Sequence, residues 1–266
     1  MNEVNENGRL LYLMNPLNRF SERASYYAHY RPTYPDEAIA KVIANRGDYP
    51  LKIAADIGAG TGISARLLAN QGLQVIAIEP NAEMRQAATA HPQVQFETGT
   101  AEQTHLPNQS VDLVTAFQAF HWFNPESALS EFYRILKPSG CLAIIWNHRN
   151  RTDSFTQEYS QILKSASKDH PAEKEKRRQS ISYLEESSLF NHFCYSAIPH
   201  QQQLDFPGLV GRTQSASYIP VEGKAAQQII QKLENLYDKW KDDQGFVYII
   251  YRTDVYLAEP QSNLKL

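Results

Sequence analysis

Three glycines, Gly58, Gly60 and Gly62, lie within five residues of one another and directly follow the short apolar segment 53–57. The chain has 266 residues and only 12 glycines, so this cluster is informative. Glycines let the backbone approach a ligand without a Cβ in the way, and they adopt φ angles that other residues avoid. A turn between a strand and a helix is also where ligands meet the carboxyl ends of parallel strands. The segment therefore predicts a cofactor-binding turn.

An acidic residue, Glu79, ends the next apolar segment, 21 residues beyond Gly58. At this offset an acidic side chain accepts hydrogen bonds from the hydroxyls of a ribose. A dinucleotide fingerprint would need glycine at position 63, where the chain has Ile63, so pyrophosphate binding is disfavoured. The alternative is that Glu79 only complements the dipole of the following helix. Together, the turn and the carboxylate favour a cofactor that contains a ribose.

Regular alternation of strands and helices surrounds these residues. Apolar runs predict strands at 53–57, 75–79, 94–96, 111–117 and 141–146, and helical spacing predicts helices at 62–71, 81–90 and from 125 onwards. Strands that alternate with helices indicate a parallel sheet covered on both faces. Uninterrupted apolar strands fit burial on both sides. We therefore predict an α/β fold with a doubly wound, mostly parallel sheet.

The flanking regions follow a different pattern. Asp36 is expected to cap a helix that ends at Gly47, and residues 150–180 are polar, which is typical of a solvated helix or loop. A late helix with an apolar face is expected to end at Gly245, before a final strand over 246–255. We divide the chain into an N-terminal segment that covers the site (1–35), a cofactor-binding core (36–147), and a substrate lobe that also completes the sheet (148–266).

Composition excludes several classes of partner. With 26 basic and 29 acidic residues the net charge is −3, which argues against a surface that coats nucleic acid. No apolar run exceeds six residues, far below the ~20 of a membrane helix. The two cysteines, Cys141 and Cys194, form no metal-binding pattern and are expected to be reduced thiols of a cytoplasmic protein. No carboxylate cluster follows the fourth or fifth strand, so no metal is predicted.

The segments 56–62, 99–102 and 110–114, together with Glu79, resemble the class I S-adenosylmethionine-dependent methyltransferases. Segments 30–35, 119–123 and 145–149 are similar to the small-molecule branch that includes trans-aconitate methyltransferase. The resemblance covers roughly residues 20–147, and it implies a Rossmann-like methyltransferase fold with S-adenosyl-L-methionine as the cofactor. Nucleic-acid methyltransferases of this fold carry an Asn/Asp-Pro-Pro-aromatic motif or a Pro-Cys pair, and this chain has neither. A small molecule is therefore the expected methyl acceptor.

The resemblance also assigns roles to individual residues. The glycines would line the methionine part of the cofactor and Glu79 would hold its ribose. Met84 would contact adenine or, alternatively, fill the core, and Tyr30 would cover the site or pack on the sheet. The full set of expected cofactor-binding residues is Tyr30, Arg31, Asp56, Gly58, Gly60, Gly62, Glu79, Met84, Ala101, Glu102 and Gln118.

S-adenosylmethionine brings its own electrophilic methyl group, so the protein must mainly bind, orient and desolvate the reactants. A base is needed only if the acceptor must lose a proton. His121 is the candidate for that role, with a packing or positioning role as the alternative, and Trp122 would form a wall of the pocket.

Arg149, Arg212 and Tyr218 could clamp an anion, although the two arginines could instead form surface ion pairs. We therefore predict a methyltransferase acting on a small metabolite, with carboxylate-bearing molecules as the favoured case. Two alternatives stay open. The first is another chemistry on a nucleoside cofactor, such as aminopropyl transfer or nicotinamide-linked reduction, and the second is a protein that binds the cofactor without turnover. The atom that would be methylated and the oligomeric state stay undefined.

Overall fold

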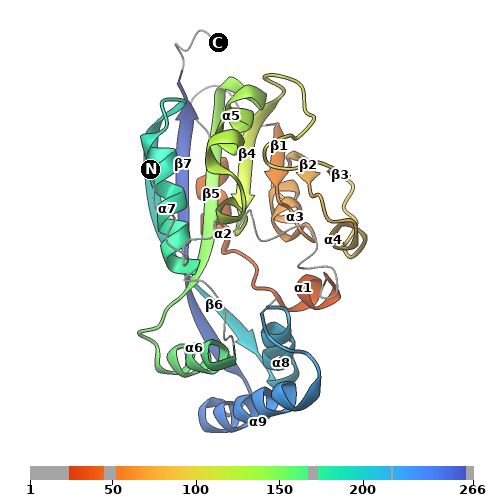
Figure 1. Cartoon of the computed structure of the whole chain (residues 1–266), viewed down its shortest axis with the longest axis vertical. Coiled ribbons are helices and arrows are strands. Elements are labelled where there is room, and N and C mark those ends of the chain that lie inside the picture. Colours follow the sequence, from red (N-terminus) through yellow and green to blue (C-terminus); the bar gives the residue numbers. More distant parts are fainter. Residues whose placement is uncertain (1–23, 45–51, 167–172, 217, 262–266) are drawn as a thin grey trace, which may run out of the picture.

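The computed structural model describes residues 24–44, 52–166, 173–216 and 218–261 (Figure 1). Its centre is a seven-stranded sheet in the order β3-β2-β1-β4-β5-β7-β6. The pairs from β3 to β5 are parallel, whereas β7 runs antiparallel to both of its neighbours. The prediction of an α/β fold with a doubly wound, mostly parallel sheet is confirmed. The strands are β1 (Ile53–Ile57), β2 (Gln74–Ile78), β3 (Val94–Glu97), β4 (Val111–Phe117), β5 (Leu136–Arg149), β6 (Phe190–Leu204) and β7 (Val247–Pro260).

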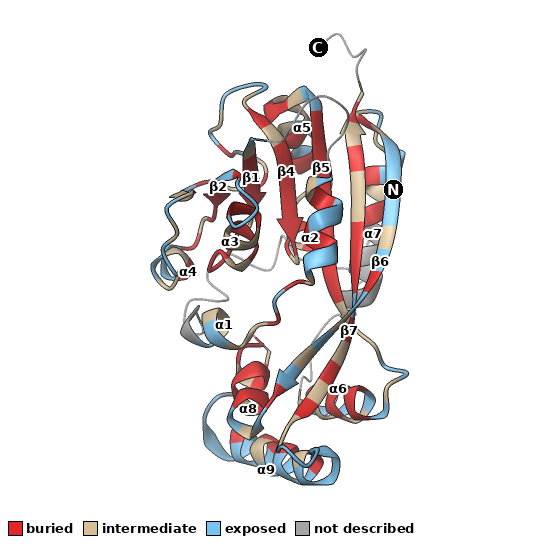
Figure 2. Ribbon diagram, turned by 180° about the vertical axis from the view of Figure 1, so that it is seen from behind, coloured by how far each residue is buried: buried red, intermediate tan, exposed pale blue. Residues whose placement is uncertain are grey.

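Helices cover both faces of the sheet, because its strands are apolar on both sides. In β5, Leu142 and Ile144 join the cluster beneath α5 and α7, whereas Ala143 and Ile145 join the cluster beneath α2 and α3. Figure 2 shows these strands as largely buried. The helices are α1 (Ala24–Tyr30), α2 (Asp36–Ile43), α3 (Ile63–Ala69), α4 (Ala82–Gln86), α5 (Pro125–Ile135), α6 (Ser154–Ala166), α7 (Glu173–Glu186), α8 (Phe206–Gln214) and α9 (Gly223–Trp240), with a 3-10 turn at Phe120–Trp122.

A smaller lobe lies below the sheet in Figure 1. It forms because β6 and β7 continue past the parallel strands, and their far ends pair Leu204 with Val247. Helices α6, α8 and α9 pack around this ribbon and enclose a third apolar cluster, which includes Tyr159, Leu209 and Leu233. The lobe therefore grows out of the last two strands of the sheet and faces the carboxyl ends of the parallel strands.

Several predicted boundaries were wrong. Pro35 is the N-cap of α2 and Asp36 its first helical residue, while Gly47 lies outside the described residues. Helix α4 ends at Gln86 instead of near residue 90. Helix α9 ends at Trp240, not at Gly245, because Asp242 Oδ1 accepts the N–H groups of Gln244 and Phe246 and builds a separate turn before β7. Strand β6 was not predicted at all.

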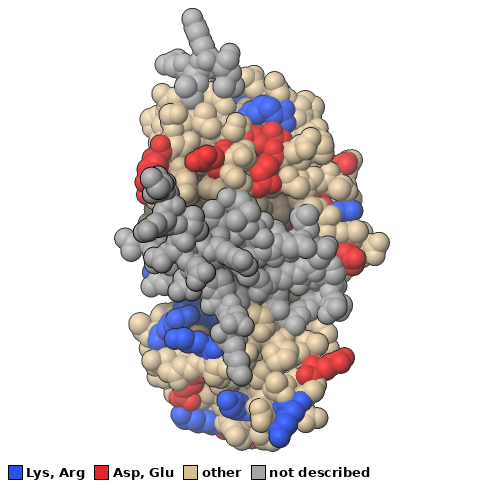
Figure 3. Space-filling model, in the orientation of Figure 1, with Lys and Arg blue, Asp and Glu red and all other residues tan. Residues whose placement is uncertain are grey.

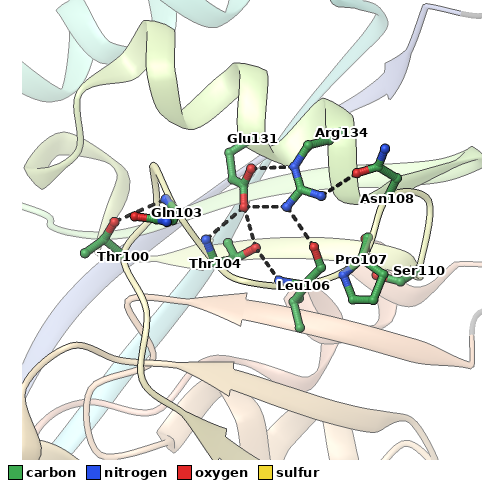
Figure 4. A network of polar contacts seen from close by, with 9 residues as sticks. All are labelled: Thr100, Gln103, Thr104, Leu106, Pro107, Asn108, Ser110, Glu131 and Arg134. Atoms are coloured by element: carbon green, nitrogen blue, oxygen red, sulfur yellow. Dashed lines mark hydrogen bonds and ion pairs between the residues drawn. The ribbon is translucent and has the colours of Figure 1, made fainter.

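The loop after β3, which carries Ala101 and Glu102, is fixed by Glu131 of α5 (Figure 4). The carboxylate of Glu131 accepts the backbone N–H of Thr104 at 2.8 Å and its hydroxyl at 2.6 Å, and it accepts Nε of Arg134 at 2.7 Å. Burial opposes the charge, but the hydrogen bonds from Arg134 and Thr104 prevail and lower the pKa of Glu131 to about 2. The loop is therefore held against α5 by an ionised carboxylate.

Candidate active site

The glycine turn links β1 to α3, and each of its glycines has a positive φ: 67° at Gly58, 58° at Gly60 and 73° at Gly62. A Cβ at Gly58 would lie 2.8 Å from the Cβ of Ala119, and one at Gly62 would lie 2.8 Å from Cζ of Phe96. Left-handed backbone costs other residues roughly 1–2 kcal/mol. The turn therefore needs glycine for its conformation as well as for its closeness to neighbouring residues.

Glu79 is buried at the end of β2 and is tied to this turn. Its Oε2 accepts the N–H of Gly60 at 2.8 Å and its Oε1 accepts the N–H of Asn81 at 2.9 Å. Burial raises the pKa of Glu79, against the lowering effect of the two N–H groups. A carboxylate can accept about four hydrogen bonds, so acceptor capacity is left for a ligand. Its bond to Gly60 gives Glu79 a role beyond complementing a helix dipole.

Asp56 lies fully buried beneath the turn. Its two oxygens accept the hydroxyls of Ser64 at 2.6 Å and Thr115 at 2.7 Å, so it joins the first turns of α3 to β4. Burial is the largest influence on this carboxyl and raises its pKa from 3.8 to about 6, although the hydroxyls act in the opposite direction. Asp56 therefore supports the turn from below.

Because of Asp56, the free energy of unfolding is expected to fall as the pH rises. Because folded Asp56 keeps its proton up to about pH 6, the native state binds more protons than the unfolded state above about pH 4. The stabilisation is complete below about pH 4 and is lost as the pH passes through about 6. At ~1.4 kcal/mol per pKa unit this amounts to about 3 kcal/mol. Urea unfolding from pH 4 to pH 7 should show this decline relative to Asp56→Asn, and parallel profiles would contradict it.

A cavity of about 640 Å³ lies between the glycine turn, the ends of β4 and β5, and the lower lobe. Eight of the predicted site residues line it, and they come from both halves of the chain. The lining residues foreseen from sequence are Arg31, Gly58, Gln118, His121, Trp122, Arg149, Arg212 and Tyr218. The lining residues that sequence reasoning missed include Tyr27, Asn147, His148, Tyr251 and Arg252.

The other predicted residues lie outside this lining. Met84 packs on the turn, since its Cε lies 3.1 Å from where a Cβ of Gly60 would be. Glu102 accepts the N–H of Asn124 at 2.9 Å. Tyr30 packs its ring against Gly211 of α8, and its carbonyl oxygen accepts Nε2–H of Gln202 in β6 at 3.0 Å. Asp56, Gly60, Gly62, Glu79 and Ala101 also lie outside the lining.

Gln118 follows β4 in a strained conformation, with a φ of 54°. Its Nε2 donates to the carbonyl oxygen of Asn147 at 3.0 Å, while its buried Oε1 has no hydrogen-bond partner among the described residues. Strained backbone and an unsatisfied buried acceptor both cost free energy, and both recur at binding sites. Gln118 therefore lines the cavity and carries an unsatisfied acceptor oxygen.

His121 is held by a neighbour in the sheet. Trp146 of β5 donates its Nε1–H to Nδ1 of His121 at 3.2 Å, and Trp122 packs beside the imidazole with 5.3 Å between ring centroids. An indole nitrogen only donates, so Nδ1 acts as the acceptor and the neutral imidazole carries its proton on Nε2. This arrangement makes His121 a donor on its Nε2 side.

Arginines are the charged side chains that line the cavity, and one of them, Arg252, is paired with Asp254. Arg212 of α8 is buried, with Nε donating to Tyr251 Oη and Nη1 donating to Ser215 Oγ, both at 3.3 Å. The guanidinium of Arg149 lies 5.7 Å from the ring of Tyr159, and its buried Nη1 has no hydrogen-bond partner among the described residues. No Asp or Glu is found among the described residues that line the cavity, whereas the arginines there are Arg31, Arg149, Arg151, Arg212 and Arg252.

Residues 55–144 match the family model of a methyltransferase domain, the span that holds the glycine turn and Glu79. Over these residues the chain is similar to methyltransferase domains. An uncharacterised methyltransferase of Mycobacterium tuberculosis is 38% identical over 149 residues, which cover 54% of this chain and 58% of that protein. A similar protein of Schizosaccharomyces pombe is 36% identical over 139 residues, or 52% of this chain and 55% of the relative. The chain thus spans little more than half the length of these curated relatives.

Several solved structures are similar over most of the chain. A candidate methyltransferase from an antibiotic biosynthesis pathway of Anabaena variabilis has a TM-score of 0.56 and 27% identity, and the alignment covers 83% of this chain and 95% of that one. In the described part of this chain, no helix is long and apolar enough to cross a membrane. The same residues hold no group of three or more His, Cys, Asp or Glu that could bind a metal ion.

Proposed function

We propose that this protein transfers a methyl group from S-adenosyl-L-methionine to a small anionic metabolite. The observation that carries the proposal is the glycine turn bonded to the buried carboxylate of Glu79, within the span that is similar to methyltransferase domains and at the edge of the cavity. The residues fit such a cofactor: Gly58 lines the cavity with backbone that no Cβ shields, and Gln118 beside it carries a buried Oε1 that has no hydrogen-bond partner among the described residues and suits the amino group of the methionine part. When bound, the cofactor supplies an electrophilic methyl group.

The chain's own residues divide the work of binding. In this proposal the glycine turn and Gln118 hold the methionine part, Glu79 holds the ribose, and Met84, Ala101 and Glu102 border the adenine. Asp56 holds the turn and Arg31 pairs with the cofactor carboxylate. Residues 36–147 form the cofactor half, while residues 1–35 and 148–266 supply the cover and the acceptor site. Trp122 forms part of the wall that excludes water.

The acceptor is expected to be an anion because of the charges around the cavity. Five arginines and no described acidic residue line it, and the buried Arg212 has no carboxylate of the described residues within 4 Å. On the face of the molecule drawn in Figure 3, most of the visible Lys and Arg side chains lie over the lower lobe. The net charge of the whole chain is −3, so attraction would come from these local groups. The similarity of segments 119–123 and 145–149 to the trans-aconitate branch also supports an acidic acceptor.

Glu79→Ala is expected to weaken cofactor binding at least tenfold. It removes the acceptor of both ribose hydroxyls, and two hydrogen bonds at about 1 kcal/mol each exceed the ~1.4 kcal/mol of a tenfold change in affinity. Titration calorimetry with S-adenosylhomocysteine measures the change. Glu97→Ala is the matched control, because Glu97 ends the neighbouring strand and is exposed. Equal affinities for the two variants would remove Glu79 from the binding site.

The proposed activity is tested by incubating the full chain with methyl-tritiated S-adenosylmethionine and panels of small acids, phenols and amines. Label should pass to an anionic member of the panel. Binding of the cofactor with no transfer to any member would favour a binding protein. Binding of decarboxylated S-adenosylmethionine or a nicotinamide dinucleotide in its place would favour another chemistry.

A further inference from the structure

Asn147, near the end of β5, lines the cavity and is hydrogen-bonded to three separate parts of the chain. Its side-chain Nδ2 donates to the carbonyl oxygen of Thr33 at 3.0 Å, and its Oδ1 accepts the hydroxyl of Thr253 in β7 at 2.6 Å. Its main-chain carbonyl accepts Nε2–H of Gln118 at 3.0 Å. A backbone carbonyl only accepts, so Nδ2 must face Thr33 and Oδ1 must face Thr253. The amide of Asn147 is therefore held in one orientation.

The bond from Asn147 fixes the segment between α1 and α2, which carries Arg31 into the lining of the cavity. His200 of β6 also hydrogen-bonds the backbone of Thr33. Only Pro32 separates Thr33 from Arg31 in the chain. The ring of a proline locks its own φ and restricts the backbone of the residue before it. Fixing the carbonyl of Thr33 therefore also fixes the position of Arg31.

The guanidinium of Arg31 is positioned by further contacts. Its Nη2 donates to the carbonyl oxygen of Ser215 at 3.0 Å, and its Cζ lies 4.5 Å from the ring centroid of Tyr27. One residue earlier in the chain, the carbonyl oxygen of Tyr30 accepts Nε2–H of Gln202 in β6 at 3.0 Å. Arg31 is thus held both through its side chain and through its neighbours in the chain. Such preorganisation lowers the entropic cost of binding a ligand.

Gln118 and Arg31 are the residues that the proposed function assigns to the amino group and the carboxylate of the cofactor's methionine part. Asn147 joins the two, because its main chain bonds Gln118 and its side chain bonds the segment of Arg31. A replacement of the Asn147 side chain leaves its main-chain carbonyl in place. Such a variant therefore releases the segment of Arg31 while Gln118 keeps its bond.

We infer that Asn147 is a positioning residue that makes this site selective for a cofactor with a carboxylate, because it holds Arg31 where the guanidinium pairs with that group. The inference rests on the proposed function. Asn147 acts through Arg31, so its side chain contributes to the binding of S-adenosylmethionine and S-adenosylhomocysteine, which both carry the carboxylate. It contributes nothing to the binding of their decarboxylated forms, which offer Arg31 no anionic partner. The bond between Asn147 and Thr33 therefore discriminates between a methyl donor and an aminopropyl donor.

Titration calorimetry of the full chain with S-adenosylhomocysteine and with decarboxylated S-adenosylhomocysteine tests this selectivity. The quantity compared is the dissociation constant of the decarboxylated ligand divided by that of S-adenosylhomocysteine. Asn147→Leu removes the amide, keeps a similar side-chain volume and adds no charge that would repel the ligand's carboxylate. It should lower the ratio at least about fivefold, the effect of one well-placed hydrogen bond. Its affinity for the decarboxylated ligand should stay within about threefold of wild type.

Asn70→Leu is the matched control. Asn70 is exposed at the end of α3, outside the lining of the cavity, and its Oδ1 is hydrogen-bonded to Nε2 of His91 at 3.2 Å. The same replacement there also removes an amide hydrogen bond, and it should leave the ratio at the wild-type value. A ratio lowered equally by both variants would overturn the role of Asn147.

Thr253→Val is a second, milder variant, since valine has the shape of threonine but lacks the hydroxyl that orients the amide of Asn147. It should lower the ratio by a smaller factor, and it decides the matter if Asn147→Leu does not fold, in which case a wild-type ratio in Thr253→Val would overturn the inference. Equal weakening of both ligands by Asn147→Leu would show a merely structural role, and a wild-type ratio near 1 would show that the site does not select for the carboxylate; either result would overturn the inference. Failure of the wild-type chain to bind either ligand would instead overturn the proposed function.

Discussion

Replacing Gly58 by alanine is expected to lower the free energy of unfolding by about 2–5 kcal/mol and to remove measurable binding of S-adenosylhomocysteine. The stability loss combines roughly 1–2 kcal/mol of left-handed strain with about 1–3 kcal/mol of overpacking. The added Cβ would meet the Cβ of Ala119 at 2.8 Å and Cζ of Phe123 at 3.1 Å, and Ala119 cannot rotate away. Urea unfolding and titration calorimetry measure the two effects.

Gly72→Ala is the control that separates the strain of a positive φ from the steric contacts of the added Cβ. Gly72 has a φ of 92°, and a Cβ there would meet no atom within 4 Å. This variant should lose only the strain, about 1–2 kcal/mol, and bind the cofactor as wild type does. If Gly58→Ala lost no more stability than Gly72→Ala and kept its affinity, the glycine turn would not be the binding element.

Arg212→Met is expected to stabilise the protein while reducing kcat/KM at least about 100-fold. A buried charge costs several kcal/mol of desolvation, and apolar replacements of buried ionic groups are stabilising by about 1–4 kcal/mol in favourable cases. The hydroxyls left behind keep other contacts, Tyr251 with Gln202 at 3.4 Å and Ser215 with the backbone carbonyl of residue 212 at 2.7 Å. The loss of activity follows from two charged hydrogen bonds at about 1.5–3 kcal/mol each.

Thermal unfolding measures the change in stability. Steady-state kinetics, with the acceptor found in the tritium screen, measures the change in kcat/KM. Lys232→Met removes the same charge from an exposed position of α9 in the same lobe, and it should leave kcat/KM unchanged. An Arg212→Met protein that is less stable and fully active would show that the guanidinium is structural.

The cofactor half could be read from the sequence because its signals are local. Strands β1 and β4 begin and end where the apolar runs do, and Asn124 caps α5 by accepting the N–H of Ser127. Strand β6 could not be read in this way. It is an edge strand whose residues are mostly exposed or half-buried, so it lacks an apolar run. Its pairing with β7 supplies the order that its own residues do not indicate.

The site residues that the sequence predicted belong to local motifs, whereas the residues that it missed depend on contacts that only the fold creates. Gly58 and Gln118 belong to motifs that follow strands, whereas His148 meets Asp254 only because β7 runs antiparallel beside β5. Nothing in the local sequence of Asp254 marks that pairing. Tyr30 likewise meets Gly211 across 181 positions of the chain, a contact that only the folded lobe creates. His148 adjoins the expected anion clamp Arg149, and that proximity was the available signal.

Calorimetric titration of the full chain with S-adenosylmethionine tests the central claim most directly. Saturable one-site heat is expected with S-adenosylmethionine and with S-adenosylhomocysteine, and none with a nicotinamide dinucleotide. Absence of heat up to about 1 mM S-adenosylmethionine, a limit of roughly 4 kcal/mol of binding free energy, would contradict the account.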